Sequence, residues 1–158
     1  MNTFQKFYQD NKERLFGYLL RRTGSSYLAA DIMQESFTRY LERYKDREQS
    51  PALLFTISRN LLYDQSRKNR YDYSYQDQEH GTDRDAEKIC SVREESRLVL
   101  DAFEQLGDEE REILSLVVSS GLSYREIAAV TGNSEANIKV KVHRARKKLR
   151  VILAENAT

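Results

Sequence analysis

The 158-residue sequence predicts an all-α fold of two small helical domains, a helical bundle and a helix-turn-helix, joined by a flexible acidic linker. Apolar residues recur at three- and four-residue steps in successive segments, which is the period of amphipathic helices. The chain has one proline, six glycines and little alternation of apolar with polar residues, so strands are not expected. A polar stretch interrupts the helical pattern and divides the chain into domains at 1–70 and 97–158, with a linker at 71–96.

Three helices are predicted in the first domain. The first begins after Thr3 and continues to Gly24, and the second begins after Ser25-Ser26. The third is the best marked, because Ser50 is an N-cap residue and Pro51 falls at the first helical position, where its missing N–H costs nothing. Three amphipathic helices with short connections can share one hydrophobic core.

The segment that follows has no apolar periodicity. Residues 71–96 contain 3 basic and 8 acidic side chains, and the run 71–81 is almost entirely polar. A segment of this composition buries too little apolar surface to offset the entropy of ordering it, so it is interpreted as a linker.

Helical patterning returns near Arg97. Asp108 is expected to cap the next helix and Gly121 to end it. Ser123 and Glu126 then form the Ser-x-x-Glu capping box that opens a further helix.

A glycine-containing turn separates that helix from the last one. Gly132 can adopt the positive φ that the turn needs, and Ser134 is placed to cap a final helix that runs to about Leu153. Ala128 and Ile138 supply the small and apolar positions where the two helices cross. The spacing predicts a helix-turn-helix, the motif that places its second helix in the major groove of DNA.

Charge is sorted along the chain although the net value is only +1. Residues 136–158 carry 7 basic and 1 acidic side chain, whereas 97–135 carry 3 and 8. The last helix directs Ile138, Val142, Ala145 and Leu149 to the core and leaves its other faces to cations. Such a helix can read base edges and neutralise phosphates. The alternative is a solvated basic face on an unrelated bundle.

Two polar groups stand out in the first domain. Asp31, Gln34 and Glu35 form one stripe on the second helix, at i, i+3 and i+4. On the third helix Asn60 is a side chain able to read a base edge, beside side chains that can stack or bind phosphate. Taken alone, each group is better explained as an exposed helix face.

The order and spacing of these pieces resemble one family. The pattern comprises Asp31-x-x-Gln34-Glu35-x-Phe37, then Leu54 through Arg59-Asn60 to Asp64 and Arg67, and then Leu106 through Glu126-Ile127-Ala128 to the basic run Ile138–Leu149. Over nearly the whole chain, apart from the linker and the last few residues, it is similar to the extracytoplasmic-function (ECF) sigma factors of bacteria.

The resemblance implies a role for each group. Asp31, Gln34 and Glu35 match the positions with which region 2 of the family docks on the clamp of the largest subunit of core RNA polymerase. The positions that bind the −10 element of promoter DNA are matched by Arg59, Asn60, Tyr63, Asp64, Arg67 and Lys68. Region 4 would contact the polymerase flap and read the −35 element through Lys139, Val140, Lys141, His143, Arg144 and Arg146.

The resemblance also implies an anti-sigma factor as a partner. Two positions depart from the family pattern: Leu53 or Leu54 stands where tryptophan is common, and Gly107 stands where Leu-Pro is usual. The function expected is promoter-specific transcription initiation. A free-standing helix-turn-helix repressor or activator is the alternative, and it leaves the polar groups of the first domain without a role.

Other classes are disfavoured by the sequence. His80 and His143 lie apart, no nucleophile-base or metal-ligand cluster occurs, and we expect no enzymatic activity, cofactor or metal. No apolar run is long enough to cross a bilayer and the N-terminus lacks the features of a signal peptide, so a cytoplasmic location without membrane insertion is expected. Cys90 is a single thiol in an acidic segment, which argues against a redox role.

Overall fold

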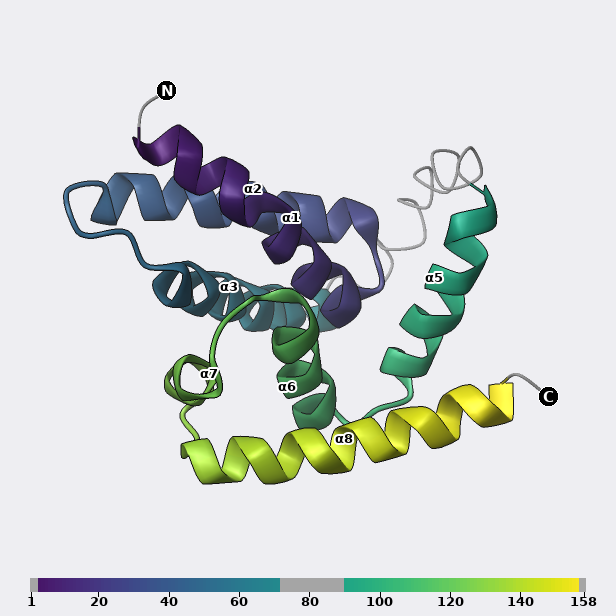
Figure 1. Ribbon diagram of the computed structural model, residues 1–158. Coiled ribbons are helices and arrows are strands. Elements are labelled where there is room, and N and C mark those ends of the chain that lie inside the picture. The colour runs from purple at the N-terminus through teal and green to yellow at the C-terminus, as the bar shows by residue number, and fades with distance from the viewer. Residues whose placement is uncertain (1–2, 72–89, 157–158) are drawn as a thin grey trace.

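The computed structural model describes the backbone of residues 3–71 and 90–156, and side chains within 3–65 and 97–156. Within these ranges the chain is helical and contains no strand, as the sequence predicts. The helices, labelled in Figure 1, are α1 (Thr3–Thr23), α2 (Ser26–Tyr44), α3 (Pro51–Tyr71), α5 (Cys90–Glu104), α6 (Asp108–Ser119), α7 (Tyr124–Thr131) and α8 (Glu135–Asn156). None of the described helices combines the length and the apolar composition that a membrane span requires.

Helices α1, α2 and α3 pack against one another and form the first domain (Figure 1). Their ends follow the local chemistry of the sequence. Gly24 takes a φ of +70° after α1, and the Ser25 hydroxyl accepts a hydrogen bond from the backbone N–H of Leu28 at 3.1 Å. The Ser50 hydroxyl caps α3 in the same way, accepting from Leu53 N–H at 3.2 Å.

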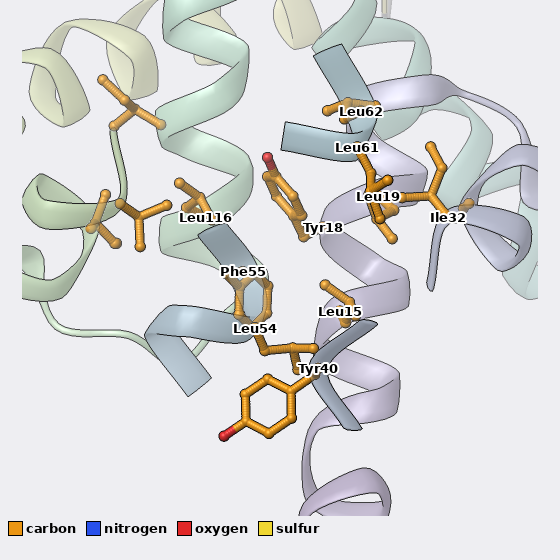
Figure 2. Packing of buried hydrophobic residues seen from close by; sticks show 14 of the residues in the cluster. Leu15, Tyr18, Leu19, Ile32, Tyr40, Leu54, Phe55, Leu61, Leu62 and Leu116 are labelled. Atoms are coloured by element: carbon orange, nitrogen blue, oxygen red, sulfur yellow. The ribbon is translucent and has the colours of Figure 1, made fainter. Parts of the chain in front are cut away.

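The core of this domain is rich in aromatic rings. Tyr40 stacks on Phe7 with ring centroids 4.8 Å apart, and its hydroxyl accepts a hydrogen bond from the backbone N–H of Ser50 at 2.9 Å. The rings of Tyr18 and Phe55 pack edge to face, with their centroids 5.6 Å apart. These contacts join all three helices, and Figure 2 shows the labelled side chains of these helices converging, with Leu116 of α6 beside them.

The second domain comprises α5 to α8, with two differences from the expected boundaries. Helix α5 begins at Cys90 rather than near Arg97, so the last part of the expected linker is helical; residues such as Arg93 and Glu94 favour helix without an apolar stripe. The N-cap of α6 is Gly107 rather than Asp108, because Asp108 is already the first helical residue. The rest of the expected linker, 72–89, lies outside the described residues.

Helix α6 is the central element of the fold. Five consecutive residues, Glu112 to Leu116, are buried because other helices cover α6 on two sides. Leu114 belongs to a core shared with Phe103 of α5 and Ile152 of α8. Leu116, on the other side, packs into the core of the first domain together with Tyr18 and Phe55 (Figure 2).

The two domains therefore pack directly on each other. Helix α1 contacts α5 and α6, and α3 contacts α7, so the cluster that fills the first domain continues into the second. Gly17 of α1 allows the close approach, since a Cβ there would lie only 3.3 Å from Oγ of Ser119 on α6. Figure 1 shows α6 standing between α3 and α8, with α8 on the far side from α1 and α2.

Candidate nucleic-acid interface and protein-docking groove

The helix-turn-helix predicted from the sequence is formed by α7 and α8. The Ser123 hydroxyl accepts from Glu126 N–H at 3.1 Å, and the Glu126 carboxylate accepts from Ser123 N–H at 3.0 Å, which completes the capping box. Gly132 takes a φ of +75° in the turn. Ser134 caps α8 by accepting from Asn137 N–H at 3.1 Å. The turn chemistry thus sets the angle between the two helices.

Helix α8 divides by face as expected. Ile138, Val142 and Ala145 are buried against the other helices of the domain. The side chains assigned to reading of the −35 element are exposed, with one exception, and they are Lys139, Val140, His143, Arg144 and Arg146. The exposed set combines cations with the apolar side chain of Val140, which is 47% exposed and able to contact a thymine methyl.

Lys141 is the exception on α8. Its ammonium group donates a hydrogen bond to Oδ1 of Asn133 at 2.9 Å and forms an ion pair with Glu109 of α6. The side chain is therefore held within the second domain, whereas its neighbours on α8 project into solvent.

A groove of about 510 Å³ lies between α2 and α3. Its lining brings together Asp31, Glu35 and Asp64, with Ile32, Arg39, Leu61 and Gln65 completing it. Asp31 and Glu35 were assigned to polymerase docking and Asp64 to the −10 element, so the structure places Asp64 with the docking residues. Gln34 is exposed and does not line the groove. No group in the described residues has the arrangement needed to hold a metal ion.

The −10 residues of α3 face in several directions. Asn60 is exposed, and the guanidinium of Arg59 lies over the ring of Tyr63, 4.8 Å from its centroid. Arg67 and Lys68 belong to α3, but their side chains lie outside the described residues. The Arg59–Tyr63 pair is a cation–π contact able to stack on an unpaired base.

Arg59 also contacts the second domain. Its Nε lies 3.2 Å from Oε1 of Glu112, and Nε of Arg22 on α1 lies 2.7 Å from Oε2 of the same carboxylate. The side chains of Arg22 and Glu112 are 5% and 3% exposed, so this is a buried charge cluster. Tyr18 donates its hydroxyl to Oε1 of Glu112 at 2.7 Å.

The ionisation of Tyr18 is set by this environment. Burial, with the added effect of the Glu112 carboxylate, raises the pKa of Tyr18 well above its ordinary value. The phenol therefore remains protonated and serves as a hydrogen-bond donor to Glu112.

Further polar contacts join α1 to α6. Arg21 donates to Oγ of Ser119 at 2.6 Å, and Arg111 donates through Nε to the carbonyl oxygen of Arg21 at 2.7 Å. Burial lowers the pKa of both arginines from the ordinary value, which reflects their partial removal from water.

Sequence reasoning did not identify Arg22, Tyr18 and Glu112 as a group. They lie far apart in the chain, and no motif links them. One signal was available: the apolar residues of 112–117 cover more than one face of a helix, which indicates a helix packed on two sides. A carboxylate within such a helix must find a partner.

A smaller cavity, of about 330 Å³, lies between the domains beside this cluster. Arg59 and Tyr63 line it from α3, while Asn133 and Lys141 line it from the second domain. Side chains assigned to the −10 and −35 elements thus border the same cavity.

Comparison with known families identifies both domains. Residues 7–71 match Sigma-70 region 2, and residues 96–149 match Sigma-70, region 4. The chain is 32% identical over 142 residues to the ECF RNA polymerase sigma factor EcfG of Rhodopseudomonas palustris, covering 88% of this chain and 78% of the relative. It is 30% identical over 155 residues to the ECF RNA polymerase sigma factor SigM of Bacillus subtilis, covering 95% and 94%.

Solved structures share the fold. The sigma factor RpoE from Bartonella quintana, solved in complex with the anti-sigma factor NepR, matches with a TM-score of 0.76 and 23% identity over 98% of each chain. CnrH, solved in complex with the cytosolic domain of CnrY, matches with a TM-score of 0.73 and 22% identity over 96% of this chain and 88% of CnrH.

A helical bundle with a groove on one side, followed by a helix-turn-helix with a basic second helix, defines a two-domain promoter-recognition factor. The chain belongs to the ECF RNA polymerase sigma factors of the sigma-70 superfamily. The expected family is thereby confirmed, and a free-standing helix-turn-helix regulator does not account for the region 2 domain.

The turn of the helix-turn-helix gives a first test. A Cβ at Gly132 would meet nothing within 4 Å, so it would cause no steric clash. The only cost of a substitution is the strain of holding a residue with a side chain in the left-handed backbone conformation. We expect Gly132→Ala to lower the free energy of unfolding of the chain by about 1 kcal/mol. Gly132→Asn should cost less, because asparagine tolerates this conformation. Urea denaturation measures both variants; equal stability of Gly132→Ala and wild type would contradict the assigned strain.

Proposed function

We propose that this sigma factor assembles with core RNA polymerase through the groove between α2 and α3. The observation that carries this role is the convergence of Asp31, Glu35 and Asp64 around the apolar side chains of Ile32 and Leu61. An acidic groove with an apolar floor suits a basic amphipathic helix, whereas it would repel DNA phosphates. Asp64 accordingly acts in polymerase docking rather than in DNA binding.

The −10 element is bound at α3 in this proposal. Asn60 is exposed and supplies the donor and acceptor that distinguish a base edge, while Arg59 and Tyr63 offer a stacking surface for an unpaired base. Arg67 and Lys68 add positive charge on the same helix for the DNA backbone.

The −35 element is read by α8. Its exposed cations and Val140 lie on the face opposite the buried stripe, and the helix-turn-helix presents that face to a major groove. Lys141 joins them when it exchanges Glu109 for a phosphate or a base edge. Acidic α6 residues beside it provide a surface for the polymerase flap.

The remaining attributes follow from this role. An initiation factor acts by binding and has no catalytic step of its own, and it works where the polymerase is, in the cytoplasm. Its regulation by an anti-sigma factor is supported by the complex of RpoE with the anti-sigma factor NepR, since this chain shares the fold of RpoE.

Reading of the −35 element is tested on α8. Lys141→Ala and Arg144→Ala should each weaken binding to a −35 duplex about tenfold, because each removes a base or phosphate contact. Arg97→Ala, which removes an exposed arginine of α5, is the matched control and should change the affinity less than twofold. Fluorescence anisotropy at fixed salt provides the measurement. Unchanged affinity of both α8 variants would remove α8 as the reading helix.

Polymerase docking is tested by charge reversal in the groove. Glu35→Lys should reduce co-purification with core polymerase at least tenfold, because a cation replaces an acid in the acidic groove. The fold should persist, since the exposed pair of Glu35 with Arg39 contributes little stability. Glu13→Lys, an exposed position on α1, makes the same charge change outside the groove. Normal recovery of Glu35→Lys with the polymerase would contradict the docking assignment.

A further inference from the structure

One side chain of the reading helix, Lys141, is held by two groups of its own domain. Its Nζ donates to Oδ1 of Asn133 at 2.9 Å and forms an ion pair with the carboxylate of Glu109 on α6. Asn133 is itself fixed, because its Nδ2 donates to Oγ1 of Thr131 at 2.9 Å and its backbone N–H donates to the carbonyl oxygen of Ala128 at 2.9 Å. The ammonium group of Lys141 therefore lies between the turn of the helix-turn-helix and the first turn of α6.

The bond to Asn133 places the charge of Lys141 near the N-terminal end of the reading helix. Lys141 belongs to the second turn of α8, which begins at Glu135, whereas Asn133 lies in the turn before the helix. Side chains of a helix lean toward its N-terminus, so the lysine stem can reach back over the preceding turn. In a helix-turn-helix, the N-terminal part of the second helix contacts base edges. The ammonium group therefore lies at the end of α8 that reads sequence.

The ion pair with Glu109 offsets an unfavourable position for this charge. A cation near the N-terminus of a helix is repelled by the helix dipole, and a neighbouring carboxylate compensates for the repulsion. The side chains of Lys141 and Glu109 are 31% and 60% exposed, so the pair is partly solvated and contributes little stability. Glu109 is therefore a partner that DNA can replace at small cost.

Asn133, in contrast, is a neutral partner that can remain in place when DNA binds. A lysine ammonium has three donors on a flexible stem, so one donor held by Asn133 leaves others for a base. The anchor belongs to the end of α7, because Oγ1 of Thr131 also donates to the carbonyl oxygen of Ile127 at 2.8 Å. An anchored ammonium group is directed to one place in the groove and loses less conformational entropy on binding than a free lysine does.

We propose that Asn133 is a specificity-determining residue for the −35 element, which anchors the ammonium group of Lys141 while that group exchanges Glu109 for a base edge. Asn133 acts through Lys141 and is thus a positioning residue. Guanine, with acceptors O6 and N7 in the major groove, is the base that fits a lysine donor. The inference deepens the proposed function and rests on it, because it requires α8 to read the −35 element. The two partners of Lys141 should therefore affect DNA binding in opposite directions.

The test uses holoenzyme assembled from the full chain and core polymerase. One probe is the promoter fragment that the wild-type holoenzyme enriches from a library randomised in the −35 segment. The second probe carries the same −35 bases in shuffled order. Fluorescence anisotropy at fixed salt gives both affinities, and their ratio measures specificity. A defect in assembly cancels in the ratio, because both probes meet the same holoenzyme.

Removal of the anchor should reduce specificity. Asn133→Ala should lower the ratio about threefold, because the ammonium group of Lys141 is no longer positioned. In a Lys141→Ala background the same change should have no further effect. Library selection with Asn133→Ala should lose its guanine preference at the position where selection with Lys141→Ala loses it. A ratio equal to that of the wild type, or an equal loss in the Lys141→Ala background, would overturn the inference.

Removal of the exchangeable partner should have the opposite effect. Glu109→Gln should bind the enriched fragment about threefold more tightly, because Lys141 no longer leaves a carboxylate to reach DNA. Asp108→Asn is the matched control, since it removes the same charge from the same turn of α6 but from an ion pair with Arg22 of α1. Its affinity for the enriched fragment should stay close to that of the wild type. Unchanged or weaker binding by Glu109→Gln, or an equal gain in Asp108→Asn, would contradict the exchange.

Failure of the proposed function gives a different result from failure of the inference. If the wild-type holoenzyme enriches no −35 sequence, α8 is not the reading helix, and the role of Asn133 falls with that function. If Lys141→Ala and Arg144→Ala lower the ratio but Asn133→Ala does not, the reading helix stands and only the role of Asn133 falls.

Discussion

The Glu112 carboxylate lies at the point where the two domains meet, and the relation between the promoter-reading surfaces depends on how it is paired. A carboxylate that is 3% exposed requires charged or hydrogen-bonding partners. Arg22, Arg59 and Tyr18 provide them from the first domain. One buried carboxylate of region 4 is thus paired with three side chains of region 2.

Apolar packing and charge have different roles in this interface. Leu116 of α6 enters the core of the first domain beside Tyr18 and Phe55 (Figure 2), and contacts of this kind supply most of the attraction between the domains. They tolerate small shifts in register, whereas the buried ion pairs do not. The combination defines one packed arrangement of the two domains.

Local chemistry was readable from the sequence wherever it is encoded within a few residues. The caps at Ser25, Ser50 and Ser123 and the positive φ of Gly132 follow from single side chains and their neighbours. The division of α8 into buried and exposed faces follows equally from its period. The start of α5 at Cys90 was missed because charged helix formers give no apolar stripe.

Contacts between distant segments were not readable in the same way. Arg59 and Glu112 are both charged residues on helices, and nothing near either one in sequence specifies the other. The position of Asp64 in the acidic groove could not be predicted from the sequence for the same reason. It depends on how α2 packs against α3. Family resemblance supplied the roles of the two domains, whereas their mutual arrangement required three-dimensional structure.

Energy transfer between dyes at Glu13 and Val118 measures the separation of the domains most directly. Both side chains are exposed, and they adjoin residues of the interface, Arg14 beside Gly121 and Ser119 beside Gly17. Dyes on cysteines introduced there in a Cys90→Ser background should transfer energy efficiently in the free chain. Transfer should fall to near zero once core polymerase and promoter DNA are bound, since the −10 and −35 elements are about 25 base pairs apart, which is about 85 Å along B-DNA. Efficient transfer in a transcribing complex would contradict the account.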